Sequence, residues 1–156
     1  MFRTLGAICA TALLAVGTAT VASANTTTTT HSNTINDAIP VTCAGPGVTA
    51  FWGTGNSIQH LTVNNAGDSW FTTTEEGQVT LVTTLSDWST ATFTGHVQEW
   101  FGAEMNNKNS VTHATFNFQG TSVSDPSMTL SMHAAFTFTT NANGVVTVNN
   151  QTVSCG

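Results

Sequence analysis

The chain has 156 residues, only 6% of them charged, and a formal net charge of −6. Its two basic residues, Arg3 and Lys108, are too few to neutralise a phosphate backbone or to bind an anionic membrane surface. This composition argues against nucleic acid as a partner. Threonine is abundant, tyrosine is absent, and Phe and Trp supply the aromatic side chains, a bias that favours β-strands.

Residues 1–24 have the three parts of a secretory signal peptide. Arg3 gives a positive start, residues 5–16 form an apolar run, and residues 22–24 form a small-x-small cleavage site. The apolar run is too short to remain as a membrane-spanning helix, so we expect no membrane insertion after cleavage. The sequence therefore predicts a secreted, extracellular protein whose mature chain starts at residue 25.

Residues 25–40 begin with a threonine run and contain little that a core would bury, which predicts a flexible leader. The remaining residues, 41–156, are predicted to form a single β domain. Cys43 and Cys155 bracket that domain, and their even number after cleavage fits a disulfide formed in an oxidising compartment.

Within this domain the apolar side chains recur at every second position, as they do in β-strands. A long strand is expected over residues 90–101. Further apolar stripes consist of Ile58, Leu61, Val63; Val79, Leu81; Ala114, Phe116, Phe118; Met128, Leu130, Met132, Ala134, Phe136, Phe138; and Val146, Val148. Turns are expected at residues 64–67, 75–77, 103–109 and 141–144.

Consecutive strands joined by short turns predict an all-β antiparallel meander. So many strands must close or divide into two sheets to protect their edges. We expect a closed or nearly closed barrel of roughly eight strands with a terminal disulfide, and a β-sandwich is the alternative.

Residues 94–109 read TGHVQEWFGAEMNNKN, which matches the pattern TGxxxxWFGxxxNNxN. Phe116, Phe118 and Gly120 then follow, and the chain ends in Cys-Gly. Together these features resemble a group of uncharacterised, small, secreted β proteins of actinobacterial type. In this sequence residues 125–127 read Asp-Pro-Ser where that group has Asp-Gly-Ser, and of its later histidines only His133 is matched. The resemblance implies export and β structure, and it implies no activity.

Three histidines, His96, His113 and His133, fall on the polar face of their strands. If neighbouring strands align their apolar faces, His113 lies opposite His133 and His96 lies diagonal to His113. Cross-strand neighbours have Cβ atoms about 5 Å apart, so the three imidazoles would suit a divalent metal. The simpler interpretation is three exposed histidines on a threonine-rich face, with no cofactor.

A ligand-binding surface is the other candidate site. Trp100 shares the polar face with Gln98 and precedes the turn that contains Asn106 and Asn107. A tryptophan ring beside amide side chains is typical of glycan binding. Alternatively, the lumen of a barrel would hold an apolar small molecule, or side chains would fill it.

Glu99 and Glu104 are the most evident pair of carboxylates, but Glu99 takes an apolar position in its strand and Glu104 belongs to a turn. We therefore predict no catalytic residues. The leading prediction is a non-catalytic binding module for an apolar small molecule or a glycan. The alternatives are a barrel-cavity enzyme of isomerase or cyclase type, by analogy of fold alone, and a structural or protein-interaction domain of the cell envelope.

Overall fold

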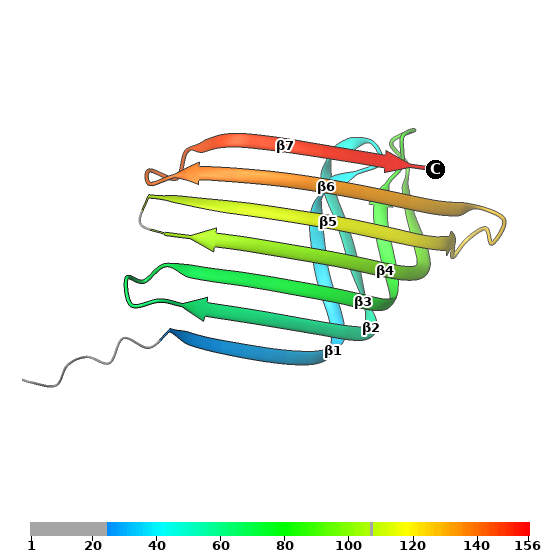
Figure 1. The fold of residues 1–156 in the computed structure, drawn as a ribbon. Helices are drawn as coiled ribbons and strands as arrows, with labels where there is room; N and C mark the ends of the chain where they lie inside the picture. The colour runs from blue at the N-terminus through cyan, green and yellow to red at the C-terminus, as the bar shows by residue number, and fades with distance from the viewer. Residues whose placement is uncertain (1–24, 107) are drawn as a thin grey trace, which may run out of the picture.

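The computed structural model describes residues 25–106 and 108–156, which form one antiparallel sheet (Figure 1). The strands lie in the sheet in chain order, so the predicted all-β meander is confirmed. They are β1 (Thr26–Thr42), β2 (Gly45–Val63), β3 (Ser69–Thr84), β4 (Thr90–Met105), β5 (Asn109–Ser122), β6 (Thr129–Asn141) and β7 (Val146–Cys155). In this part of the chain no helix could span a membrane. The predicted signal peptide lies outside the described residues.

The sheet is not closed, so the predicted barrel of roughly eight strands is not confirmed. The described residues form 7 strands, with β1 and β7 as the two edges. A disulfide joins Cys43, directly after β1, to Cys155 at the end of β7, with 5.8 Å between their Cα atoms. The predicted disulfide is thus confirmed, and it links the two edges covalently.

The sheet bends sharply, and its first strands turn back over its inner face (Figure 1). Phe51 of β2 packs on Phe116 of β5 with ring centroids 5.1 Å apart, although β2 and β5 are not neighbours in the sheet. Gly95 and Gly120 are direct partners near the bend, and a Cβ atom on Gly95 would collide with the carbonyl oxygen of Gln119. Glycine is needed there because the backbones approach so closely.

The N-terminal segment differs from the prediction of a flexible leader over residues 25–40. Residues 26–42 form β1, which pairs with β2 along its length. The β-branched threonines suit a strand, and the later half of β1 buries Ile35, Ile39 and Val41. Pro40 has no Cα partner and lies at an irregularity of the ladder, where its missing N–H is tolerated.

Two of the predicted turns are confirmed and a third is not. Residues 64–67 and 141–144 form turns in which Gly67 and Gly144 adopt positive φ angles of 84° and 75°. Residues 75–77, in contrast, lie inside β3. The two consecutive glutamates and the glycine suggested a turn, but β2 and β4 pair with β3 on both sides at this point.

Alternation along the strands separates an inner, buried face from an outer, mostly polar one. The fully buried members of the inner face include Phe51, Leu81, Phe93, Val97, Phe116, Phe118 and Met132. The inner face also contains side chains that are not apolar, and these form the candidate site.

Candidate ligand-binding site

Two glutamates stand side by side on the inner face of the sheet. Glu75 of β3 and Glu99 of β4 are direct cross-strand partners, and Ser57 of β2 is the partner of Glu75 on its other side. Direct partners have Cβ atoms about 5 Å apart, a spacing at which two like charges repel. The register of the sheet therefore brings two acids together in its interior.

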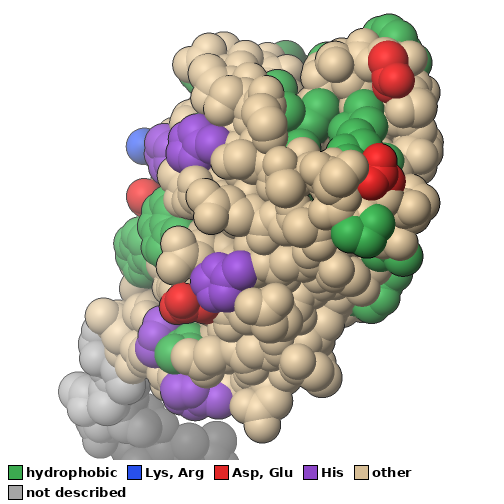
Figure 2. Space-filling view, turned by 90° about the vertical axis from the view of Figure 1, so that its right-hand side faces the viewer, with side chains coloured by type: hydrophobic (Ala, Val, Ile, Leu, Met, Phe, Trp, Pro, Cys, Tyr) green, Lys and Arg blue, Asp and Glu red, His purple; other side chains and the backbone are tan. Residues whose placement is uncertain are grey.

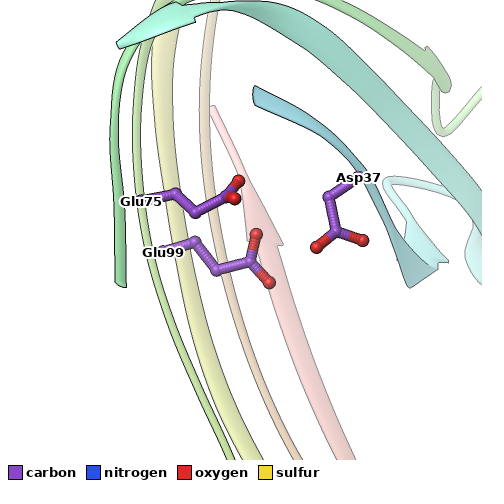
Figure 3. A group of neighbouring side chains, drawn as sticks. All are labelled: Asp37, Glu75 and Glu99. Atoms are coloured by element: carbon purple, nitrogen blue, oxygen red, sulfur yellow. The ribbon is translucent and has the colours of Figure 1, made fainter. Parts of the chain in front are cut away.

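A third carboxylate reaches the pair from β1. Asp37 lies in the strand that the bend carries across the inner face, and it points toward Glu75 and Glu99 (Figure 3). One carboxylate oxygen from each of the three residues lies within 4.8 Å of the other two. Asp37 is exposed at the rim of this cluster, which we call the acidic cluster.

The two glutamates are buried with unequal hydrogen bonding. Glu75 is 5% exposed and Glu99 is 6% exposed. Ser57 Oγ donates a hydrogen bond of 2.7 Å to Glu75 Oε1. Glu75 Oε2 and Glu99 Oε2 have no hydrogen-bond partner within the described residues. A buried polar atom without a partner is costly, so such atoms often indicate a missing ligand, ion or water.

Burial raises the pKa of both glutamates. For Glu99, loss of solvation is the main cause and the negative charges of Asp37 and Glu75 add to it, which raises the pKa to about 8. For Glu75, burial also raises the pKa, the hydrogen bond from Ser57 opposes this, and Asp37 adds to the rise. At neutral pH the Glu99 carboxyl of the ligand-free protein therefore holds its proton.

The acidic cluster borders a cavity of about 390 Å³ between β1 and the inner face of β3 to β6. Asp37 and Glu99 belong to its wall. The rest of the wall is mainly apolar and aromatic, with Gln59, Thr73 and Thr112 as polar members and Ala38, Pro40, Phe71, Phe101, Phe136 and Phe138 as apolar ones. Because Asp37 is exposed, the cavity is accessible from solvent at that edge.

The structure does not bring the three candidate histidines together. His113 pairs with Thr137 and His133 pairs with Asn117, so the two lie four residues apart along the ladder, roughly 13 Å. His96 contacts Glu76 at 3.5 Å instead. The expected alignment of apolar faces is present, but the register differs by four residues, which leaves each face unchanged. Figure 2 shows histidines spread over one side of a largely uncharged surface.

The residues predicted for glycan binding do not form one site. Trp100 is 43% exposed on the outer face, and its ring lies over Gly102. Gln98 instead donates a hydrogen bond to Glu76 (3.3 Å) and borders a separate hollow. Asn106 accepts backbone N–H bonds from Lys108 and Asn109 and so stabilises its turn. Asn107 lies outside the described residues.

Sequence reasoning found one member of the acidic cluster and paired it with the wrong acid. Glu99 was placed correctly at an apolar position of its strand. Its expected neighbour, Glu104, lies on the outer face and is exposed. Glu75 was hidden by the predicted turn, although its spacing of four from Phe71 and Val79 indicates the inner face. Asp37, likewise, alternates with Ile35 and Ile39.

Comparison with protein-family models, with curated protein sequences and with solved structures finds no match to this chain. The resemblance to small secreted actinobacterial proteins therefore stays a prediction. Function has to be inferred from the cavity and its side chains.

Proposed function

We propose that this chain is a secreted binding protein whose cavity takes a small molecule with a largely apolar body. The observation that carries the proposal is the cavity of about 390 Å³ with four phenylalanines in its wall. Small-molecule sites in proteins are typically 300–1,000 Å³, mostly apolar, with a few polar groups. The disulfide between Cys43 and Cys155 supports export to an oxidising compartment.

The same geometry supports the alternative function, an isomerase or cyclase, less well than it supports binding. Glu75 and Glu99 are adjacent acids in unlike hydrogen-bond environments, and such pairs can transfer protons. Catalysis would further require a substrate with its reacting atom beside Glu99, whereas binding requires only the cavity. Incubation with a ligand followed by chiral liquid chromatography separates the two, because an isomerase or cyclase converts the ligand to a product of equal mass but different retention time.

The binding proposal predicts that a larger side chain in the cavity wall will exclude an apolar probe. We expect the neutral dye Nile red to gain fluorescence with the wild-type protein and to bind the Thr112→Phe variant at least tenfold more weakly. Thr112 lies in the cavity wall, so the phenyl ring takes up the volume that the dye needs. The measurement is a fluorescence titration.

Thr121→Phe is the matched control, since Thr121 belongs to the same strand but is exposed. Circular dichroism of both variants checks that the sheet is intact. Equal affinity of the wild type and Thr112→Phe would place the dye elsewhere and contradict the proposal, as would a wild-type protein that does not bind the dye.

A second candidate function is glycan binding on the outer face. The specific observation is a shallow groove of about 230 Å³ that contains the half-exposed rings of Trp70 and Trp100, with Gly102 between them. Thr72, Glu104 and His113 supply polar groups along it. A ring that lies flat on the sheet leaves one face free to stack on a sugar.

Glycan-array binding tests this groove. If a glycan binds there, Trp100→Ala should weaken binding at least tenfold, because the stacking surface is removed. Trp52→Ala should have little effect, since Trp52 is equally exposed but outside the groove. A signal that survives Trp100→Ala would rule out this surface.

A further inference from the structure

The acidic cluster contains buried carboxyl oxygens that lack a hydrogen-bond partner and that a cationic donor would satisfy. Glu75 and Glu99 are each more than nine-tenths buried, and their Oε2 atoms have no hydrogen-bond partner in the described part of the chain. Both point toward Asp37 at the edge of the cavity (Figure 3). Buried carboxylates are normally paired with a cation or fully hydrogen-bonded.

The described part of the chain does not supply such a cation. The whole sequence contains two basic residues, Arg3 and Lys108. Lys108 is exposed in the turn between β4 and β5, and Arg3 precedes the described residues. The ion pair found among the described residues joins His96 to Glu76 on the outer face. Among the described residues no cation lies at the acidic cluster, so a ligand is the source of positive charge that we consider.

The wall beside the cluster indicates which kind of cation fits. A hard metal ion such as Ca²⁺ takes six to eight oxygen ligands and retains water. Beyond the carboxylates, the cavity wall has side-chain oxygens in Gln59, Thr73 and Thr112, whereas Phe71, Phe101, Phe136 and Phe138 offer no metal ligand and form poor contacts with water. Aromatic rings instead suit the apolar body of an organic cation and attract its charge through their faces.

The geometry of the oxygens also fits an ammonium group. An alkylammonium has three N–H donors in tetrahedral directions, with N···O distances of about 2.8 Å to carboxylates. Three acceptors placed along those directions lie about 4.6 Å apart. The three carboxylates of the acidic cluster offer oxygens that are all within 4.8 Å of one another.

We propose that the cavity selects an amphiphilic amine, whose ammonium group binds between Asp37, Glu75 and Glu99 while its apolar body lies against the phenylalanines. This inference rests on the proposed function and specifies its ligand class. Asp37 and Glu99, with its unpartnered oxygen, line the same cavity as the four phenylalanines, and Glu75 lies directly beside Glu99. The cavity therefore offers a place for both parts of such a molecule.

The test compares three probes of equal chain length, octylamine, 1-octanol and octanoate, by displacement of Nile red at pH 7.5. We expect octylamine to bind at least tenfold more tightly than octanol, and octanoate to bind most weakly. In the Glu75→Gln/Glu99→Gln variant the preference for octylamine over octanol should fall below threefold. Glutamine keeps the shape and removes the charge.

The matched control is Glu76→Gln/Glu104→Gln, which removes two charges from the same strands on the outer face. It should keep the full preference for octylamine. Equal binding of octylamine and octanol by the wild type would overturn the amine inference and leave the proposed function standing. No displacement by any of the three probes would overturn both. A preference that the outer-face control also loses would overturn the inference.

A titration with calcium chloride tests whether the acidic cluster binds a metal ion instead of an amine. If 1 mM Ca²⁺ binds the ligand-free protein in calorimetry and abolishes octylamine binding, the acidic cluster is a metal site and the amine inference is wrong. If the single variant Glu75→Gln folds where the double variant does not, it replaces the double variant, with a smaller loss of amine preference expected.

Discussion

Glu99→Gln is expected to stabilise the folded, ligand-free protein by about 3–5 kcal/mol at pH 8 and above, and by little below pH 4. Burial raises the pKa of Glu99 from 4.5 to about 8. Each unit of difference between the folded and unfolded pKa corresponds to about 1.4 kcal/mol, so about 5 kcal/mol is an upper bound.

The sign follows from which state holds the proton. Between about pH 4.5 and 8 the folded protein keeps a proton on Glu99 that the unfolded chain has lost. Stability is therefore full below pH 4.5 and falls as pH rises toward 8. The pKa of Glu75 is raised as well, so Glu75 contributes in the same direction. Glutamine does not titrate and removes this loss.

Urea unfolding of the wild type and of Glu99→Gln at several pH values from 4 to 9 measures the effect. Glu76→Gln, one residue from Glu75 and exposed, is the control and should follow the wild type. A stability difference that is the same at every pH would show that the Glu99 carboxyl does not titrate in this range. The buried carboxylates would then be ionised at every pH tested, and interactions in the folded protein would already offset the cost of burying their charge.

Removing the disulfide with Cys43→Ser/Cys155→Ser is expected to lower the free energy of unfolding by about 4–5 kcal/mol. The bridge spans 112 residues, and in the chain-entropy model a loop of this length contributes about that much by restricting the unfolded chain. The disulfide also acts in the folded protein, because β1 and β7 are sheet edges that do not pair with each other and the bridge holds them together.

Urea unfolding at pH 5, with and without a reducing agent, checks this prediction. The reductant should lower the midpoint of the wild type and leave the double-serine variant unchanged. A loss below about 1 kcal/mol would mean that the unfolded chain is already compact or that the bridge is strained. Because β1 also carries Asp37, the variant should hold octylamine more weakly than the wild type.

The strand faces were the most predictable part of the structure. Alternation of apolar side chains correctly placed Phe93, Val97 and Phe101 inside and His96 and Trp100 outside, since successive side chains of a strand point to opposite faces. The same alternation indicated that Glu99 faces inward. Strand alternation does not depend on which strand is the neighbour, so a single sequence is enough to reveal it.

Strand register was not predictable in the same way. A shift of two or four residues leaves every side chain on its original face, so periodicity cannot distinguish between such registers. His113 and His133 were expected to be partners and are instead separated by four positions. The turns and bends between the strands determined the register.

The sequence by itself determined the all-β meander, the disulfide and the inner and outer faces, because these depend on local alternation and on cysteine number. Only the tertiary structure decided that the sheet stays open, that residues 26–42 form a paired strand, and that Asp37 meets Glu75 and Glu99. The last of these requires the bend that carries β1 across the inner face. Such a bend arises from packing between strands far apart in the chain, for which no short sequence pattern exists.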